Sequence, residues 1–299
     1  MGRVLISPPT EPKTMEPTPV STHEREFRFT GQDFEQIRHK LRAVTGIHLS
    51  EQKMSMVYGR LSRRIRELKL SSVAAYLQYL KMHPEEYEFF INALTTNKTH
   101  FFRELHHFDY LAQTLIPQWR QRPQRPQRPQ RPVHIWSTAC STGEEPYSIA
   151  ATVLAEGADI AARVKILATD LDTQVLATAR KGIYRGSAMA GIPAPYLKAG
   201  FVRGKGEFQG MMQPKSCCRE MILFRQLNLF ARWPFKQPMD VIFCRNVLIY
   251  FDKPTQHQLL ERFWQLLSPG GVLLLGHSES VGPLAHQFTA VGQTSYLKH

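Results

Sequence analysis

The sequence predicts an α/β protein in which a mostly parallel sheet is flanked by helices and preceded by a small all-helical domain. Residues 133–276 alternate short apolar strands with helical segments, the pattern of strands that are joined by crossover helices. Residues 26–95 show helical periodicity and no comparable strand. At 299 residues, the chain is long enough for both units, each with a packed core.

The net charge and the cysteine content indicate what kind of partner and which cellular compartment to expect. The formal net charge is +13 and the pI is near 9.7, so we expect an acidic partner: nucleic acid, anionic lipid or an acidic protein surface. The four cysteines form no CxxC pair, which favours reduced thiols over zinc or a disulfide framework. Because no window approaches the ~20 apolar residues of a membrane span, we expect no signal peptide, no direct membrane insertion and a cytoplasmic location.

The N-terminal region divides into a lead and a helical domain. Residues 1–25 are rich in proline and poor in apolar residues, and we expect them to be disordered. A helix is expected to begin at Thr30, which has N-cap spacing with Asp33, and to end at Gly46. Ser50 is expected to cap a second helix. Further short helices are expected over residues 73–82 and 84–94.

The second helix combines an apolar stripe with arginines. The stripe comprises Met54, Val57, Leu61, Ile65 and Leu68. The arginines on the other faces are Arg60, Arg63, Arg64 and Arg66. They form either an ordinary solvated face or a docking surface for an acidic helix or for nucleic-acid phosphates, because guanidinium matches carboxylate and phosphate equally well. Charge alone does not separate these alternatives.

Residues 96–132 are expected to be a linker that carries an insertion. Its first part, up to Tyr110, lies between the helical domain and the first strand, where it can fold over a ligand. His106 and His107 lack the spacing of a helical zinc site and a third ligand, so we expect surface or capping histidines and no metal. The QRP repeat, which supplies five arginines between Arg120 and Arg131, is expected to be an extended spacer in a surface loop.

The stretch VHIWSTACSTGEEPYSIA, residues 133–150, predicts a strand, a turn of small residues and a helix opened by Glu144 and Glu145. Open α/β sheets bind nucleotide-like ligands at such units. Two carboxylates at the turn disfavour a phosphate and favour a ligand with hydroxyls or positive charge. An S-adenosyl group, with a sulfonium, an ammonium and a ribose diol, meets that description. The alternative is an ordinary βα turn of an unrelated α/β protein.

The next expected strand, residues 164–170, ends at Asp170. An acidic side chain at that position can accept hydrogen bonds from both ribose hydroxyls, as in dinucleotide-binding folds. The alternative is that Asp170 only caps the following helix, residues 173–181.

Residues 182–218 interrupt the α/β alternation. Four glycines, Gly200, Gly204, Gly206 and Gly210, punctuate short aromatic or β-branched pieces and predict a small antiparallel hairpin module. The module is either a structural turn or an exposed sheet edge to which a peptide adds a strand.

The alternation then resumes to the end of the chain. Strands are expected over 221–227, 240–244 and 271–276, a helix over 254–267 and a β-rich piece over 288–297. Polar residues that follow the strands share the edge of the opening turn: Glu145, Asp170, Asn228, Arg245, Asn246 and Tyr250. That edge is the predicted ligand site.

Several long runs, in order, resemble the CheR family of chemotaxis receptor methyltransferases from about Phe29 to the C-terminus. The runs are Asn92–Glu104, Trp136–Ser148, Ala168–Tyr184, Phe243–Asp252 and Gly276–Ser280. The resemblance implies a class I S-adenosylmethionine-dependent methyltransferase domain, Rossmann-like, over residues 133–299, with an antiparallel β-subdomain inserted at about 185–220. It implies an enzyme that methylates glutamate side chains on the cytoplasmic helical bundle of chemotaxis receptors and releases S-adenosylhomocysteine. We expect the enzyme to be a monomer.

The resemblance also implies roles for individual residues. The cofactor contacts would be Asn97, Thr99, Arg103, Glu145, Asp170, Asn228, Leu229, Arg245 and Asn246. Arg103 and Tyr250 would lie beside the transferred methyl group. Of the two adjacent carboxylates we expect Glu145 to bind the cofactor and Glu144 to be a solvent-facing or capping neighbour, with the reverse order left open.

Partner contacts are expected on two surfaces. Arg60, Arg63 and Arg64 would dock an acidic receptor helix. The segment RGKGEFQG resembles the family's peptide-binding subdomain, so Arg203, Gly204 and Gly206 would contact a receptor's C-terminal pentapeptide.

Two rival functions use the same ligand edge. A nucleic-acid methyltransferase agrees with the charge of +13, but the sequence has no aromatic stacking platform near the site and no recognisable RNA-binding module. A cofactor-binding scaffold without catalysis is disfavoured by Arg103 and Tyr250.

Overall fold

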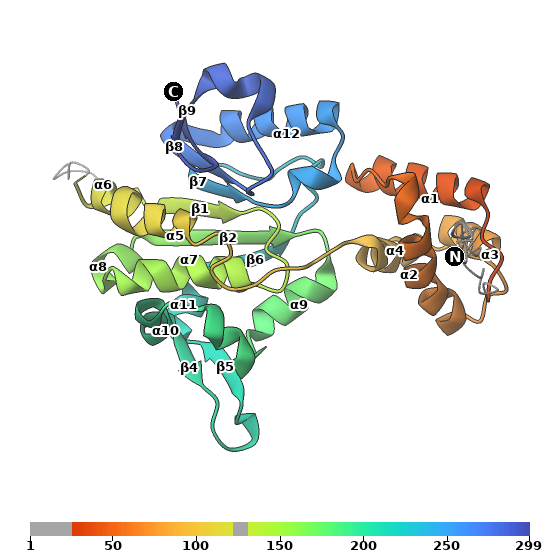
Figure 1. Cartoon of the computed structure of the whole chain (residues 1–299), viewed down its shortest axis with the longest axis horizontal. Coiled ribbons are helices and arrows are strands. Elements are labelled where there is room, and N and C mark those ends of the chain that lie inside the picture. Colours follow the sequence, from red (N-terminus) through yellow and green to blue (C-terminus); the bar gives the residue numbers. More distant parts are fainter. Residues whose placement is uncertain (1–25, 122–130) are drawn as a thin grey trace, which may run out of the picture.

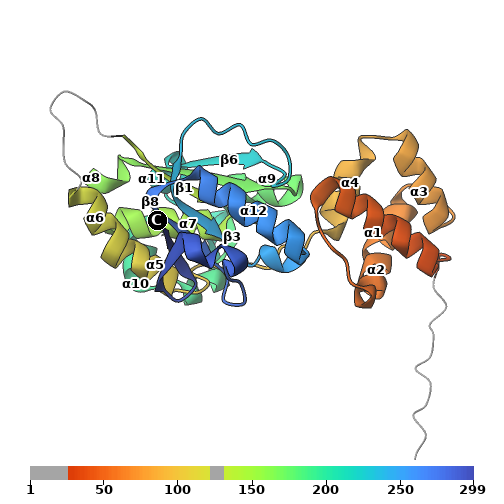
Figure 2. The ribbon, with the colours of Figure 1, turned by 90° about the horizontal axis from the view of Figure 1, so that it is seen from above.

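The computed structural model describes residues 26–121 and 131–299. The expected disordered lead and the centre of the QRP repeat lie outside these residues. A helical domain and an α/β domain lie side by side (Figure 1), and the view from above shows the helical domain beyond one end of the α/β domain (Figure 2). No helix in the two described ranges has the length and apolar character needed to cross a bilayer.

The helical domain is built as its sequence periodicity predicts. Its elements are α1 (Gly31–Thr45), the 3-10 turn η1 (Glu51–Lys53), α2 (Met54–Glu67), α3 (Val73–Met82) and α4 (Glu86–Leu94). Thr30 and Asp33 form a capping box, and Gly46 ends α1 with φ +73°. Ile37, Leu41, Val57, Leu61 and Ile65 are fully buried in its core. The expected cap at Ser50 is wrong: its side chain makes no capping hydrogen bond, because a 3-10 turn precedes α2.

The α/β domain contains a seven-stranded sheet in the order β6-β2-β1-β7-β8-β10-β9. Its strands are β1 (Val133–Ser137), β2 (Val164–Asp170), β6 (Ile222–Gln226), β7 (Met239–Cys244), β8 (Leu267–Leu275), β9 (Phe288–Gly292) and β10 (Ser295–Lys298). β6, β2, β1, β7 and β8 pair in parallel, and β10 pairs antiparallel with β8 and β9. The chain leaves β1 toward β2 on one side and later returns to β7 on the other. The crevice beyond β1 is therefore where ligands of such sheets bind.

Helices cover both faces of the sheet. They are α7 (Glu144–Ala155), α8 (Ala158–Ala161), α9 (Thr173–Lys181) and α12 (Lys253–Leu266), with short 3-10 turns η5 (Leu248–Tyr250) and η6 (Gly282–Gln287). One apolar core joins α7 to one face of the sheet, and a second joins α12 to the other face through Trp136 and Phe263. These two cores fix the strand ends that carry the site.

The segment that the sequence analysis assigned to a linker contains a further helix. It runs through α5 (His106–Tyr110), a π-helical turn η2 (Leu111–Leu115) and α6 (Ile116–Gln121). Phe108, Leu111, Leu115 and Trp119 bury one side of it in the core with α7. The helix therefore belongs to the α/β domain, and its apolar spacing of three and four residues was present in the sequence.

The expected antiparallel module is a three-stranded sheet in the order β3-β5-β4 with short helices around it. Its elements are β3 (Tyr184–Arg185), η3 (Gly186–Gly191), α10 (Ala194–Gly200), β4 (Phe201–Arg203), η4 (Gly206–Phe208), β5 (Met211–Pro214) and α11 (Ser216–Glu220). A Cβ at Gly200 would come within 2.5 Å of the Ala151 Cβ, so glycine lets the module pack closely on α7.

The helical domain contacts the α/β domain at the carboxyl ends of the strands. The Asn228 side chain donates to the Val44 carbonyl at 2.6 Å, and the His48 backbone N–H donates to the Tyr250 carbonyl at 2.8 Å. Arg42 forms an ion pair with Asp252. The domain junction therefore lies at the same edge as the predicted ligand site.

Candidate active site

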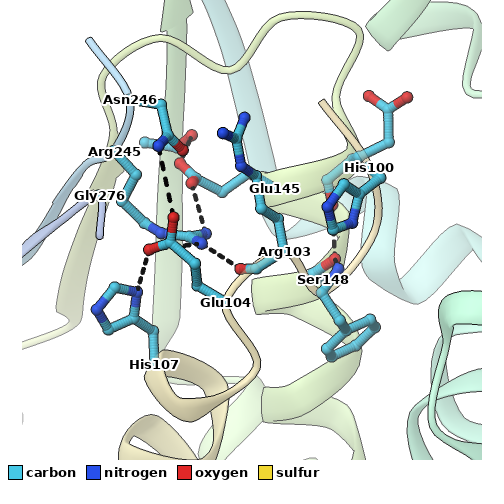
Figure 3. A network of polar contacts seen from close by, with 12 residues as sticks. His100, Arg103, Glu104, His107, Glu145, Ser148, Arg245, Asn246 and Gly276 are labelled. Atoms are coloured by element: carbon cyan, nitrogen blue, oxygen red, sulfur yellow. Dashed lines mark hydrogen bonds and ion pairs between the residues drawn. The ribbon is translucent and has the colours of Figure 1, made fainter. Parts of the chain in front are cut away.

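Arg245, which directly follows β7, is the centre of a buried network of charges (Figure 3). Its side chain is 2% exposed. Nη1 donates to Glu145 Oε2 at 3.1 Å, and Nη2 lies 3.4 Å from Glu104 Oε2 and donates to the Arg103 backbone carbonyl. One guanidinium thus joins the end of β7, the start of α7 and the segment of residues 95–105.

The pKa values of the two carboxylates beside Arg245 are shifted in opposite directions. Burial raises the pKa of Glu145, and Arg245 and the Ser137 hydroxyl, which donates to Glu145 Oε1 at 2.7 Å, oppose that rise. Burial also acts to raise the pKa of Glu104, but Arg245 and His277 outweigh it and the pKa is lowered. The network is therefore a set of compensated charges held out of water.

Asp170 closes the other side of this edge. Its Oδ2 accepts the Ser141 backbone N–H at 2.8 Å, and its Oδ1 accepts the Asp172 N–H at 3.0 Å. Burial raises its pKa to about 6. The capping alternative for Asp170 is wrong, because Asp172 caps α9 through the N–H groups of Gln174 and Val175.

Residues 95–105 lie across the turn after β1, as their position in the chain predicted. The Ser141 hydroxyl donates to the Asn97 carbonyl at 2.8 Å, and the Asn97 side chain donates to Asp172 Oδ2 at 2.7 Å. The Phe102 N–H donates to the Ser148 hydroxyl on α7 at 3.0 Å. These contacts tie the segment to the ligand edge at both of its ends.

Arg103 sits in strained backbone within this segment. Phe102 and Glu104, on either side, have φ values of +53° and +56°. Such values are uncommon for residues other than glycine and cluster at functional sites. The half-buried Arg103 side chain donates to the Lys98 carbonyl at 3.1 Å, and Thr99 lies half-buried in the same segment.

The remaining predicted site residues divide into two groups. Asn246 adjoins the network, with its side chain 3.4 Å from Glu104 Oε1, and the Tyr250 hydroxyl lies 3.4 Å from the Thr96 carbonyl. Burial raises the pKa of Tyr250. By contrast, the Asn228 side chain is directed to the helical domain, and Leu229 is buried in the core of the α12 face.

Glu144 has a local partner of its own. Its Oε2 accepts the Thr142 hydroxyl at 2.6 Å, a contact within the turn, and burial raises its pKa. Glu145, not Glu144, is joined to Arg245.

The adjacent histidines differ from the sequence expectation. His107 is fully buried rather than on the surface or at a cap, and burial lowers its pKa to about 3. Glu104 supplies the third group that the sequence analysis did not find, and one ligand atom from each of Glu104, His106 and His107 lies within 4.8 Å of the others. Glu104 already has a positively charged partner, because it is paired with the guanidinium of Arg245.

The α2 arginines have separate environments. Arg64 makes two hydrogen bonds, of 2.8 and 2.7 Å, to Glu86, whose side chain is 3% exposed. Arg60 donates to the Thr95 carbonyl at 2.6 Å, at the start of the segment over the site. Arg63 is 83% exposed and forms an ion pair along the helix, with Glu67.

The predicted peptide-binding residues lie on the antiparallel module. β4 is an edge strand of its sheet and ends at the exposed Arg203. The Gly204 N–H donates to the Met211 carbonyl at 2.9 Å, and Gly206 has φ +60°. Glycine is needed at Gly204 because a Cβ there would lie 2.1 Å from the Phe208 carbonyl oxygen.

Comparison with known proteins agrees with this arrangement. Residues 97–297 match the model of the CheR methyltransferase SAM-binding domain, and residues 32–95 match that of the CheR methyltransferase all-alpha domain. The chain belongs to the CheR methyltransferase family. It is therefore an S-adenosylmethionine-dependent methyltransferase with the class I fold, and the fold, enzyme class and cofactor predicted from the sequence are confirmed.

Relatives of the CheR family match over most of their length. The chain is 47% identical over 285 residues to chemotaxis protein methyltransferase 2 of Pseudomonas aeruginosa, covering 95% of this chain and 98% of the relative. It is 43% identical over 266 residues to the chemotaxis protein methyltransferase of Klebsiella aerogenes, covering 88% of each. The Escherichia coli protein of the same name is 42% identical over 266 residues, covering 88% of this chain and 89% of that protein.

The chemistry of the site fits S-adenosylmethionine. The edge presents the carboxylates of Asp170, which is buried, and of Glu145, whose side chain is 12% exposed; both suit hydroxyl and ammonium groups. Within the described residues, Arg245 Nε is buried and has no hydrogen-bond partner, so this donor suits the cofactor's own carboxylate. A phosphate site would instead present a lysine or free backbone N–H groups at a helix N-terminus. The contacts at this edge come from carboxylates and an arginine.

Proposed function

We propose that this methyltransferase esterifies glutamate side chains on the cytoplasmic helical bundle of chemotaxis receptors, acting as a cytoplasmic monomer. The relatives' names support a chemotaxis substrate. The observation that carries the proposal is the position of Arg103, a half-buried arginine whose own backbone is bound by the Arg245 network. A cation at that place suits an anionic acceptor.

The acceptor needs no general base. A glutamate of ordinary pKa, about 4.3, is ionised at neutral pH and attacks as the carboxylate. S-adenosylmethionine supplies a methyl carbon activated by a sulfonium: the oxygen–carbon bond forms as the carbon–sulfur bond breaks, and the sulfur leaves as a neutral thioether. The protein's task is to align these atoms and exclude water, which can contribute ~7–11 kcal/mol.

The cofactor would be held by groups from several elements. We assign this role to Asn97, Thr99, Arg103, Glu145, Asp170, Asn228, Leu229, Arg245 and Asn246. Asp170 would accept from ribose hydroxyls, which it does best when ionised, above its pKa of about 6. Glu145 and Arg245 would hold the charged amino-acid end of the cofactor.

Arg103 and Tyr250 would act on the acceptor. The guanidinium of Arg103 can hold one carboxylate oxygen and leave the other free to attack. It cannot bind the carboxylate too strongly, because the charge on the nucleophile falls in the transition state. Tyr250 would orient the same carboxylate or shield the methyl group.

Two exposed surfaces would bind the receptor. Among the α2 arginines, the exposed Arg63 is best placed to meet an acidic helix, while Arg60 and Arg64 would contribute charge at the rim. The edge strand β4, with Arg203, Gly204 and Gly206, would pair with a receptor's C-terminal pentapeptide.

One assay tests the proposed reaction. The enzyme is incubated with S-adenosylmethionine labelled on its methyl group, a receptor cytoplasmic fragment and RNA together. We expect label on the receptor as an ester that is released by base, and no label on a fragment whose candidate glutamates are alanine. Label on RNA would favour the nucleic-acid alternative, and base-stable label on protein would exclude a glutamate ester.

A further inference from the structure

Glu279 is a buried carboxylate that the proposed reaction does not use. Its Oε1 accepts the backbone N–H groups of Val247 at 2.8 Å, Leu248 at 2.7 Å and Ile249 at 3.4 Å. Its Oε2 accepts those of Asn246 at 2.9 Å and Gly276 at 2.6 Å. One side chain therefore holds four consecutive N–H groups of the loop after β7.

The negative charge of Glu279 is balanced by these backbone groups. No lysine, arginine or histidine of the described chain forms an ion pair with it within 4.0 Å. Burial raises its pKa, and the N–H groups of Gly276, Asn246, Leu248 and Val247 oppose that rise. Hydrogen bonds to an ionised acceptor are about twice as strong as neutral ones, so the loop is firmly anchored.

Gly276 completes the anchor at the end of β8. A Cβ at this position would lie 2.6 Å from Asn246 Nδ2, 2.7 Å from Asn246 N and 2.8 Å from Glu279 Oε2. Only glycine lets the two loops approach so closely. The close approach of the two loops therefore depends on two residues of the Gly276–Ser280 motif, Gly276 and Glu279.

The anchored loop carries two residues of the proposed site. Asn246 has φ +58°, a left-handed conformation in which its N–H donates to Glu279, and its side chain is directed to Glu104. Tyr250 closes the same loop, with its N–H donating to the Val247 carbonyl at 3.1 Å. The position of both side chains follows from the backbone that Glu279 holds.

We infer that Glu279 is a positioning residue for methyl transfer, which sets Asn246 and Tyr250 through the backbone N–H groups of residues 246–249. The inference rests on the proposed roles of Asn246 and Tyr250. Glu279 acts only through the loop.

Glu279→Gln tests the inference because it preserves shape but replaces one acceptor oxygen with an amide donor. We expect kcat to fall and the KM for S-adenosylmethionine to rise, each by about tenfold or more, because small displacements of site residues have effects of up to ~10²-fold. The KM for the receptor fragment should stay within about twofold. Glu261→Gln, on α12, removes an exposed carboxylate that pairs with His257 and should behave as wild type.

A double-mutant cycle separates positioning from a general loss of stability. Glu279→Gln is also introduced into the Asn246→Ala/Tyr250→Phe background. If Glu279 acts through these two residues, it should have little further effect there, whereas a purely structural role would add its full effect. Additive losses, or wild-type kinetics for Glu279→Gln, would overturn the inference. Wild-type kinetics for Asn246→Ala/Tyr250→Phe would instead refute the proposed site.

A measurement on the wild-type enzyme tests the inference even if the Glu279→Gln variant does not fold. Hydrogen exchange should show the amides of residues 246–249 strongly protected although they lie outside the sheet, because they are bonded to a buried carboxylate. Exchange at the rate of an open loop would overturn the inference.

Discussion

The carboxyl edge of the sheet and the surface of α2 are both rich in charge, but they hold it in opposite ways. At the sheet edge, Arg245 is 2% exposed and is shared between Glu104 and Glu145. On α2, Arg63 is 83% exposed and pairs with Glu67, a neighbour on its own helix. Buried, mutually fixed charges suit a small ligand of defined shape, whereas exposed charges suit steering of a large partner.

The contrast also exists within α2 itself. Arg64 is directed inward to the buried Glu86, which also accepts the Tyr76 hydroxyl at 3.0 Å. Arg63, one residue earlier, faces solvent. Residues that are equivalent by charge therefore have different environments, and substitutions can separate them.

The largest effect is expected for Arg245→Met. It leaves Glu104 and Glu145 without their shared cation, and breaking a buried ion pair costs ~3–5 kcal/mol of unfolding free energy. Calorimetry should also show S-adenosylhomocysteine affinity at least about a hundredfold weaker. Arg66→Met, which breaks the exposed pair with Glu26, is the control and should leave the unfolding free energy close to that of the wild type. Equal effects of the two substitutions would contradict the contrast between the regions.

The next largest effect is expected within α2. Arg64→Met should lower the unfolding free energy by about 3 kcal/mol, because Glu86 is left buried without a cation. Arg63→Met should cost less than about 1 kcal/mol in urea denaturation. If Arg64→Met is as stable as Arg63→Met, the ion pair between Arg64 and Glu86 does not stabilise the fold.

The pH dependence of cofactor binding should report Asp170. Because its pKa is about 6, it is ionised above that pH and becomes protonated below it, losing its capacity to accept from both ribose hydroxyls. We expect S-adenosylhomocysteine affinity to fall about tenfold between pH 8 and pH 5, since about one tenth of such a group is ionised one unit below its pKa. Asp170→Asn should bind weakly with little change over this range; a wild-type profile in that variant would assign the titration to another group.

The smallest effect is expected for Arg63→Glu. Reversing one exposed charge should lower kcat/KM for receptor methylation a few-fold at low salt, and the difference should shrink as salt screens it. Arg38→Glu on α1 reverses another arginine's charge away from α2 and is the control. A loss that is independent of salt, or equal in the two variants, would remove Arg63 from the docking surface.

Sequence reasoning was most successful where one local pattern decides the structure. The bounds of β2 and α9 follow from an apolar run and from helical spacing, and both agree with prediction. The capping box at Thr30 is likewise a local signal. The helix after residue 105 has helical apolar spacing, but its place between two domains favours a linker, so the sequence prediction there is wrong.

Other features depend on tertiary packing that one sequence does not contain. Arg64 differs from Arg63 because its face of α2 meets α4, where Glu86 lies. Glu104 pairs with Arg245 only because residues 95–105 fold over Arg245. Glu279 lies in a motif that the sequence analysis had noted, but its four consecutive N–H partners are brought to it by β7 and β8. The residue types at the site were predictable, and their partners were not.

The role of Arg103 can be measured by single-turnover methyl transfer to a receptor fragment, alongside calorimetry with S-adenosylhomocysteine. For Arg103→Ala, we predict that transfer falls at least about a hundredfold at saturating receptor, because the carboxylate is no longer aligned. Cofactor affinity should survive in part, since Asp170, Glu145 and Arg245 remain. Arg103→Lys should restore little, because an ammonium lacks the planar fork. Near-normal transfer by Arg103→Ala would contradict the proposed alignment of the acceptor.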